Sequence, residues 1–178
     1  MVAAISAGFY MKRRACYTSG SNDKGEKLRG GRKENVLMII LGAAFFLNIV
    51  AINFIPPTIE EFVALGYTIF GIGAAFYILS LLTLRRKGVS RIVDSGIYGI
   101  VRHPMYLGAI IMFFSHFFLG QNWIVAIGTI TAIVCCSLII LSDEDHNLQK
   151  YGDDYKRYMK KVPRINFILG IIRLLRKK

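Results

Sequence analysis

Long uncharged stretches alternate with short charged ones along the chain. Charged residues are absent from residues 36–56, 62–84 and 105–142. A transmembrane helix needs about 20 consecutive apolar residues, so each of the first two stretches predicts one span. The third stretch has 38 residues, which is long enough for two spans. The pattern therefore predicts an all-α, multi-pass membrane protein with about four transmembrane helices.

The third stretch is predicted to be a helical hairpin. Gly120, Gln121 and Asn122 interrupt its apolar character, and a glycine beside two amides favours a tight turn. The two arms are then Met105–Leu119 and Trp123–Leu141. At about 1.5 Å per residue the first arm is shorter than a hydrocarbon core of roughly 30 Å. We expect it to thin the membrane locally or to turn inside it.

The N-terminal segment, residues 1–35, is basic and is predicted to be partly disordered or interfacial. Its apolar start, residues 1–11, is too short to cross a membrane and shows no evident signal-peptide cleavage site. Residues 17–34 are rich in Gly, Ser, Lys and Asn, which is typical of a mobile loop. Contact with anionic lipid headgroups is the expected role of this segment.

Two amphipathic helices are predicted after the last span. Residues 150–161 form the first helix, on which Tyr155, Tyr158 and Met159 share one face at the spacing of packing residues. Residues Phe167–Leu175, with the basic residues that follow them, form the second helix on the membrane surface.

The net charge of +12 decides on which side of the membrane the polar segments lie. In a soluble protein this charge would suggest a nucleic-acid partner, but here Lys and Arg gather beside the apolar stretches, in residues 12–33, 85–102 and 150–178. The other two connections, residues 57–61 and 120–122, contain neither. By the positive-inside rule all basic segments are predicted to face the cytoplasm, and no nucleic-acid partner is expected.

Two of these cytoplasmic segments carry candidate chemistry. Pro104 forces His103 out of helical geometry and suits the first turn of the following helix, so His103 is predicted at a helix mouth. At the far end of the hairpin an acidic cluster begins with Asp143 and Glu144. A hairpin returns to the face from which it left, so we expect these acids to approach His103 and Tyr106. Such a site suits a ligand that carries both kinds of charge.

Other polar or small residues inside the apolar stretches are interpreted as structural. Gly66, Gly71 and Gly73 predict close helix packing, with a ligand against Gly71–Gly73 as the alternative. His116 is interpreted as a buried, hydrogen-bonded histidine rather than a proton relay. The three cysteines lack the spacing of a metal site, and no metal is predicted.

The order of the polar residues resembles a known family. The resembling segments are, in chain order, Ser95–Tyr98, Arg102–Gly108, Asp143 with Glu144, Tyr151–Tyr155 and Val162–Arg164. This series resembles the isoprenylcysteine carboxyl methyltransferase and phospholipid methyltransferase superfamily of membrane enzymes. Its order and spacing are much more specific than the Arg-His-Pro triplet alone.

The resemblance divides the chain into four segments. The basic N-terminal segment, residues 1–35, precedes two transmembrane helices in residues 36–84. Residues 85–165 are the expected methyltransferase core, made of a connector, the helical hairpin and a cytosolic helix. Residues 166–178 are the basic membrane-surface tail.

The resemblance also implies that S-adenosylmethionine binds in a pocket that faces the cytosol. The implied cofactor contacts are Arg91, Ile92, Val93, Tyr98, His103, Pro104, Met105, Tyr106, Asp143 and Glu144. Positioning is expected from Arg102, His103 and Glu144, and no protein nucleophile is required because methyl transfer is an in-line displacement. Carboxylates suit the cationic groups of the cofactor, whereas helix-mouth N–H groups or Arg102 suit its carboxylate.

The expected acceptor is a lipophilic small molecule or a membrane lipid, as in the isoprenylcysteine enzymes. Family members that act on isoprenylcysteine carry an arginine one helical turn before the first acid, where this chain has Ile139. That difference argues against a carboxylate acceptor. A phospholipid amine is the alternative acceptor.

Two other classes of protein remain open. Membrane sterol reductases also carry an Arg-His-Pro segment at a helix start and use NADPH, but the residues Leu107–Ala109 depart from their pattern. A small membrane transporter or scaffold would be non-enzymatic. Such a protein would not need Tyr98, His103 and Glu144 together.

Overall fold

The computed structural model describes residues 24–87 and 92–176, with side chains from residue 31 onward. Within these ranges the chain forms five α-helices and one 3-10 turn, so the predicted all-α fold is confirmed. The elements are α2 (Lys24–Phe54), α3 (Glu60–Lys87), η1 (Gly96–Gly99), α4 (Pro104–Gly120), α5 (Trp123–Lys161) and α6 (Phe167–Leu175).

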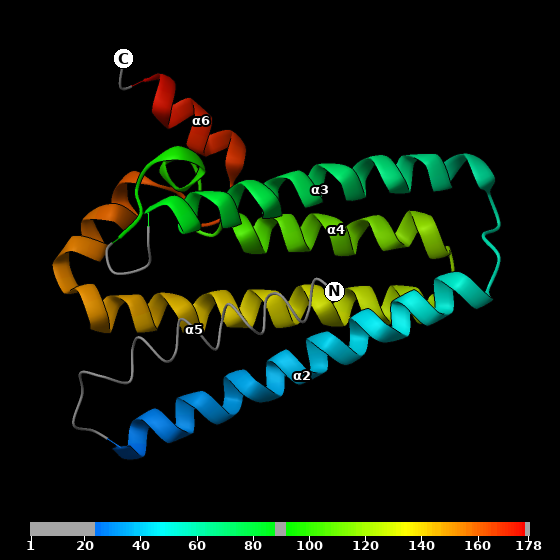
Figure 1. The fold of residues 1–178 in the computed structure, drawn as a ribbon, viewed down its shortest axis with the longest axis horizontal. Helices are drawn as coiled ribbons and strands as arrows, with labels where there is room; N and C mark the ends of the chain where they lie inside the picture. The colour runs from blue at the N-terminus through cyan, green and yellow to red at the C-terminus, as the bar shows by residue number, and fades with distance from the viewer. Residues whose placement is uncertain (1–23, 88–91, 177–178) are drawn as a thin grey trace.

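Four long helices run beside one another along the long axis of the molecule (Figure 1). Helix α3 packs on α4, α4 packs on α5, and α2 packs mainly on α5. In the described part of the chain, α2, α3 and α5 are long and apolar enough to cross a membrane. Helix α4 is shorter, with 17 residues, as expected for the first arm of the hairpin.

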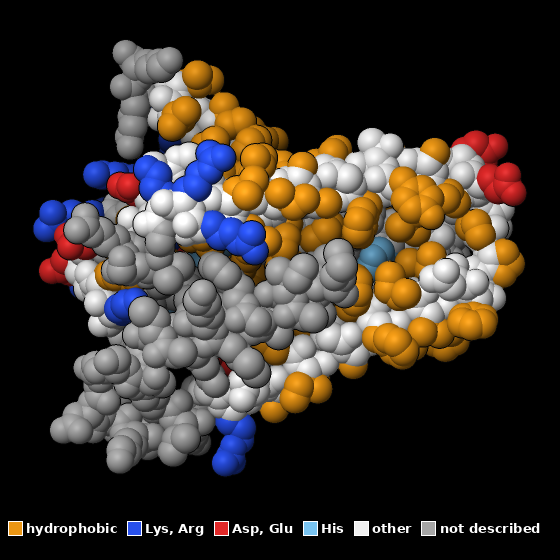
Figure 2. Space-filling model, in the orientation of Figure 1, with side chains coloured by type: hydrophobic (Ala, Val, Ile, Leu, Met, Phe, Trp, Pro, Cys, Tyr) orange, Lys and Arg blue, Asp and Glu red, His pale blue; other side chains and the backbone are white. Residues whose placement is uncertain are grey.

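The outside of the bundle is apolar, which is the reverse of a soluble protein. Large exposed hydrophobic side chains include Ile39, Phe46 and Phe54 on α2 and Tyr67 and Ile78 on α3. Figure 2 shows such side chains over the bundle, while most of the visible Lys and Arg side chains gather toward one end. Lipid tails cover an apolar surface of this extent, and an aqueous solvent does not. The protein is therefore an integral membrane protein.

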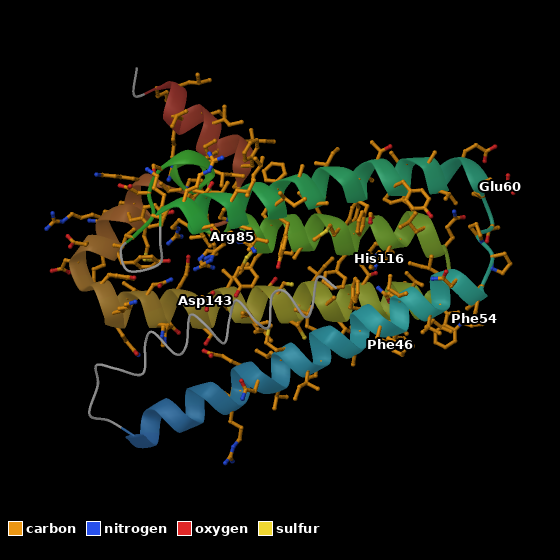
Figure 3. All side chains as sticks on the ribbon, in the orientation of Figure 1. Phe46, Phe54, Glu60, Arg85, His116 and Asp143 are labelled. Carbon is orange, nitrogen blue, oxygen red and sulfur yellow. The ribbon has the colours of Figure 1, made fainter. Side chains whose placement is uncertain are left out.

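The two ends of the bundle differ in charge. Helix α3 begins with Glu60 and Glu61 and ends with the basic residues 85–87. Figure 3 places Arg85 and Asp143 toward one end of the bundle and Glu60 at the other. The two motif-bearing segments thus lie at the same end, as the hairpin topology predicts.

The turn between α4 and α5 follows the prediction closely. Helix α4 ends at Gly120, and Gln121 adopts a left-handed conformation with φ of 47°. The Asn122 side chain caps α5 by accepting a hydrogen bond from the Val125 N–H at 3.0 Å. Gln121 also exchanges two hydrogen bonds with the backbone of Ile59, at 2.8 and 2.7 Å. These bonds join the two connections at this end of the bundle.

Glycines set the distance between α3 and α4. A Cβ atom at Gly73 would lie 2.8 Å from the Gly108 carbonyl oxygen, and Gly66 packs as closely on Leu119. The packing interpretation is confirmed for Gly66 and Gly73. At Gly71, by contrast, a Cβ atom would meet nothing within 4 Å.

A neutral polar cluster joins three helices inside the bundle. The amide nitrogen Nδ2 of Asn48, on α2, lies 3.1 Å from His116 Nδ1 of α4. The same amide donates a hydrogen bond to Thr129 Oγ1 of α5 at 3.0 Å. All three side chains are buried. Because a buried polar group in lipid needs a partner, these bonds stabilise the arrangement of α2 on the hairpin. The interpretation of His116 as a hydrogen-bonded buried histidine is confirmed.

The start of α2 differs from the prediction. A mobile loop was expected over residues 17–34, but α2 begins at Lys24, so the expectation is wrong from that residue onward. Extending an existing helix is easier than nucleating one, and the span supplies the nucleus. The Ser142 hydroxyl of α5 also donates to Glu34, which holds this turn of α2 against the hairpin. Residues 1–23 lie outside the described ranges.

The cytosolic helix predicted over residues 150–161 is continuous with the last span. Helix α5 runs from Trp123 to Lys161 with one break, at Gly152, where φ is 53° and ψ is −126°. Glycine tolerates this backbone conformation, which other residues rarely adopt. The break turns the final part of α5 away from the bundle axis (Figure 1). The helix ends before Val162, as predicted.

Candidate active site

The site lies at the polar end of the bundle, at the start of α4. The described part of the connector between α3 and α4, residues 92–103, meets the helix there. His103 is the residue before the first turn of α4, with φ of −122° and ψ of 57°, and Pro104 follows it inside the helix. The sequence predicted this non-helical geometry from the proline. Upstream, Gly96 with φ of 62° starts the turn η1, which carries Tyr98.

The segment after α5 closes the site from the other side. The Arg102 N–H donates to the Pro163 carbonyl at 3.0 Å, and the His103 N–H donates to the Arg164 carbonyl at 3.2 Å. We call residues 162–166 the closing segment. Its backbone thus runs beside the residues that precede α4, and it delivers the Arg164 side chain to the site.

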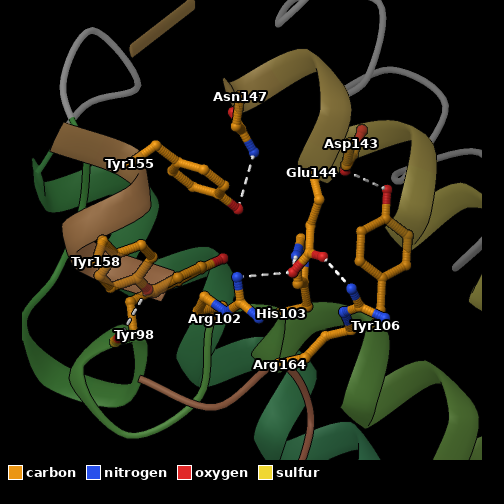
Figure 4. Close-up of polar contacts among 10 residues, drawn as sticks. All are labelled: Tyr98, Arg102, His103, Tyr106, Asp143, Glu144, Asn147, Tyr155, Tyr158 and Arg164. Atoms are coloured by element: carbon orange, nitrogen blue, oxygen red, sulfur yellow. Dashed lines mark hydrogen bonds and ion pairs between the residues drawn. The ribbon is translucent and has the colours of Figure 1, made fainter. Parts of the chain in front are cut away.

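A charged cluster forms around Glu144 of α5 (Figure 4). Arg102 Nη1 and His103 Nε2 lie 3.0 and 3.3 Å from the same oxygen, Glu144 Oε1. Arg164 Nη2 pairs with the other oxygen, Glu144 Oε2. The side chains of Arg102, His103 and Glu144 are all buried. Two guanidinium groups face one carboxylate, so the cluster carries excess positive charge.

The charged cluster keeps Glu144 ionised. The residue lies beyond the apolar part of α5, which ends at Leu141. Burial by itself raises the pKa of this carboxyl, but contacts with His103 and Arg164 and the charge of Arg102 outweigh burial and lower the pKa to about 2. Glu144 is therefore an anion at any physiological pH.

Arg102 has hydrogen-bonding capacity left over. Its Nε atom is buried and has no hydrogen-bond partner among the described residues, whereas Nη1 forms the ion pair with Glu144 Oε1. Buried donors are almost always hydrogen-bonded, so unpaired donors beside a pocket are candidate ligand contacts. An anionic group that accepts from a guanidinium suits them best.

Tyrosines surround the charged cluster. The Tyr158 hydroxyl donates to the Tyr98 carbonyl at 2.6 Å, and burial raises the pKa of the Tyr158 hydroxyl, which stays neutral. Asn147 Nδ2 lies 3.5 Å from the Tyr155 hydroxyl.

On the other side of Glu144, the Tyr106 hydroxyl donates to Asp143 Oδ2 at 2.9 Å. These contacts are drawn in Figure 4.

A pocket opens between these groups. The empty space between its lining residues, counted together with the solvent at its open side, is about 610 Å³. Six of the ten predicted cofactor contacts line it: Ile92, Val93, Tyr98, His103, Met105 and Tyr106. The predicted positioning residue Arg102 lines it as well.

The other four predicted contacts are placed differently. Asp143 and Glu144 lie behind the pocket wall, where they bond to Tyr106 and to the charged cluster. Pro104 is buried in the first turn of α4. Arg91 lies outside the described residues. Contact of any of the ten residues with a cofactor stays a prediction.

Several pocket residues had no place in the predicted set. They are Leu84, Asn147, Tyr151, Tyr155 and Tyr158. Asn147 and Tyr151 follow Asp143 at intervals of four residues, so helical spacing from the acidic pair could have indicated them. The face with Tyr155 and Tyr158 was interpreted as packing, and these rings do pack at 5.8 Å between centroids while also lining the pocket.

Comparison with known proteins gives one match. A family model described as phospholipid methyltransferase matches residues 36–154, which is about two thirds of the chain. No match was found among curated proteins or among solved structures. The matched range includes α3 and α4 in full, α5 as far as residue 154, nearly all of the apolar part of α2, and most of the pocket. It ends before Tyr155, Tyr158 and Arg164.

Proposed function

The chain belongs to the phospholipid methyltransferase family, and from this premise we propose that it binds S-adenosylmethionine in the pocket beside the charged cluster and methylates a lipophilic acceptor. The family consists of integral membrane methyltransferases, so the protein is a membrane methyltransferase. Its members generally use S-adenosylmethionine. Family membership favours methyl transfer over the reductase and transporter alternatives.

The state of the Arg102 side chain is the main observation in support of a cofactor site here. Its unpaired buried Nε donor and the excess positive charge of the cluster suit the α-carboxylate of S-adenosylmethionine. Glu144 is occupied by Arg102, His103 and Arg164, so its proposed role is to hold Arg102 and His103 in place. A direct contact from Glu144 to the cationic part of the cofactor is not needed for this role.

The aromatic side of the pocket suits the rest of the cofactor. Tyr98, Tyr155 and Tyr158 offer ring faces for the adenine and for cation–π attraction to a sulfonium. Ile92 and Val93 of the connector add an apolar wall.

Catalysis by positioning agrees with these residues. The cofactor supplies a methyl group that is already activated on a sulfonium, so the protein needs no covalent nucleophile. The chain's own residues are proposed to orient the two reactants and to keep water out of the pocket. Arg102 and His103 fix one end of the cofactor, and the tyrosines fix the other.

The acceptor is proposed to arrive from the membrane. The pocket lies at the end of the bundle that Arg85 and Asp143 mark in Figure 3, and lipid headgroups are expected at that level of an apolar bundle. Ile139, one turn before Asp143, is completely buried and offers no cation for a carboxylate. We therefore favour a neutral or amine nucleophile on a lipid, such as a phospholipid amine, over an isoprenylcysteine carboxylate. We propose that this end faces the cytoplasm, and its basic segments support that orientation through the positive-inside rule.

Calorimetry on the purified protein in detergent tests the cofactor. We expect S-adenosylmethionine and S-adenosylhomocysteine to bind, and Arg102→Gln to weaken both at least tenfold by removing one charge-assisted contact. Arg86→Gln, an exposed arginine at the end of α3, is the matched control and should bind as the unmodified protein does. Binding of NADPH with no binding of either sulfur compound would refute the proposal.

A radiolabelled methyl-transfer assay then tests the acceptor. A membrane lipid extract and a prenylcysteine analogue are supplied in parallel with the labelled cofactor. We expect label in the lipid fraction and none in the prenylcysteine. Label in the prenylcysteine alone would overturn the choice of acceptor and leave the methyltransferase assignment in place.

A further inference from the structure

Helix α6 contacts the segment before α4 and the transmembrane helix α3. Its inner face packs on the connector, because Gly170 lies so close to Ile100 that a Cβ atom would overlap the Ile100 carbonyl. The Phe167 ring contacts the Phe76 ring of α3 in an edge-on arrangement, at 5.0 Å between centroids. The helix thus touches both a pocket-bearing connector and a transmembrane helix.

The outer face of α6 is apolar and uncovered by the described residues. Ile168, Ile172 and Leu175 recur at the spacing of one helical face, and Ile168 and Leu175 are 72% and 65% exposed. A soluble partner or a lipid surface would cover such a face. Which of the two covers it is decided by the charges around it.

Those charges are all positive. Arg173 and Arg176 are exposed beside the apolar face, and the sequence continues with Lys177 and Lys178. The segment from residue 167 to the end contains no Asp or Glu. A short helix with an apolar face and a cationic border is the pattern of helices that lie in the headgroup layer of an anionic membrane.

The position of α6 fits a membrane surface. The helix leaves the bundle obliquely to its long axis, at the end opposite Glu60 (Figures 1 and 3). That end also carries the basic last turn of α3. The headgroup layer that meets this turn is therefore within reach of α6.

We propose that α6 is a docking surface for the anionic headgroups of the bilayer, and that its docking holds the closing segment against the active site. The closing segment leads directly into α6, and its backbone accepts the hydrogen bonds from Arg102 and His103. It also supplies Arg164 to Glu144. The docking is inferred from the apolar face and the positive charges of α6 alone. Its effect on ligand affinity rests on the proposed function.

The test compares the full-length protein in two kinds of nanodisc, one of phosphatidylcholine alone and one with added phosphatidylglycerol. Amide hydrogen exchange of residues 167–175 reports docking, and calorimetry with S-adenosylhomocysteine reports the pocket. We expect slower exchange and tighter binding in the anionic nanodiscs. Two arginines near an anionic surface should strengthen docking by about fivefold each.

Matched double variants separate docking from general charge. Arg173→Gln with Arg176→Gln should remove the difference between the two lipids. Lys156→Gln with Arg157→Gln, exposed cations on the last part of α5, should preserve it.

Equal exchange of α6 in both nanodiscs, or equal losses in both double variants, would overturn the docking surface. Lipid-dependent exchange with unchanged ligand affinity would overturn the coupling to the pocket. Because exchange needs no cofactor, a protein that binds no S-adenosylhomocysteine still gives a result for α6.

Discussion

Two buried polar clusters in this protein serve different purposes. The neutral cluster of Asn48, His116 and Thr129 lies inside the bundle and joins three helices by hydrogen bonds. The charged cluster around Glu144 lies at the polar end, beside a pocket, and leaves the buried Nε of Arg102 without a partner among the described residues. Burial of polar groups therefore does not by itself mark a functional site. What singles out the charged cluster as the candidate site is its excess charge and its position beside a pocket.

Removing the carboxylate of the charged cluster should have the largest effect. Glu144→Gln keeps the size of the side chain but leaves two guanidinium groups without their anion, which costs about 3–5 kcal/mol when one partner of a buried pair is lost. We expect a lower unfolding temperature and no measurable binding of S-adenosylhomocysteine by calorimetry. Asp153→Asn, whose pair with Lys156 is exposed, should change neither. If Glu144→Gln bound S-adenosylhomocysteine as tightly as the unmodified protein, the charged cluster would have no role in ligand binding.

Moving α4 should disturb both clusters at once, because this helix begins beside His103 and carries His116. Gly73→Ala would press a Cβ atom on the backbone of α4, and overpacking of this kind costs about 1–3 kcal/mol. Both the unfolding midpoint and the affinity for S-adenosylhomocysteine should fall. Gly71→Ala is the matched control in the same helix, where a Cβ atom meets nothing within 4 Å. Similar losses in the two variants would contradict the close approach of α3 and α4.

Removing the hydrogen bonds of the neutral cluster should lower the stability of the protein without changing its affinity for the ligand. Asn48→Ala removes the hydrogen bonds to His116 and Thr129, and interhelical bonds of this kind contribute about 0.6 kcal/mol on average and up to about 1.7 kcal/mol. The unfolding midpoint should fall while ligand affinity stays constant. Asn53→Ala is the control, since that exposed side chain bonds only to the Ile49 carbonyl of its own helix. A parallel fall in affinity would mean that the two clusters are coupled.

The smallest effect is expected from mild acid. The pKa of Glu144 is lowered from 4.5 to about 2, so its stabilisation is complete above pH 4.5 and is lost as the pH falls through about 2. Titration of Glu144 should therefore leave the unfolding midpoint unchanged between pH 8 and 5. Unfolding curves of the unmodified protein and of Glu144→Gln should run parallel in this range and converge only in stronger acid. Convergence already near pH 5 would place the pKa of Glu144 at an ordinary value.

The fold was largely predictable because the bilayer restricts what a chain can do. Uncharged stretches of sufficient length must be helical in lipid, since every backbone polar group needs an internal partner. The turn at Gln121 and the helix start at Pro104 follow from the conformational limits of single residues. The start of α2 at Lys24 was missed because local composition does not reveal that a neighbouring span extends a helix.

The sequence predicted most residues of the candidate site. It did not predict which of their side chains form ion pairs with one another. Glu144 was expected near His103, and the structure confirms that approach at 3.3 Å. The pairing of Glu144 with Arg164 was not foreseen, because 20 residues and the break at Gly152 separate the two along the chain. Only the folded backbone, through the bonds of the closing segment to Arg102 and His103, brings Arg164 to the acid.

The closing segment has a practical consequence for anyone who transplants this enzyme. A chimera cut at the end of the family match, residue 154, would keep Glu144 and Arg102 yet discard Tyr155, Tyr158 and Arg164. Such a hybrid would still insert into a membrane and still show the family's sequence signature. Its pocket would lack one wall, so the minimal exchangeable unit extends at least through the backbone bonds at Pro163 and Arg164.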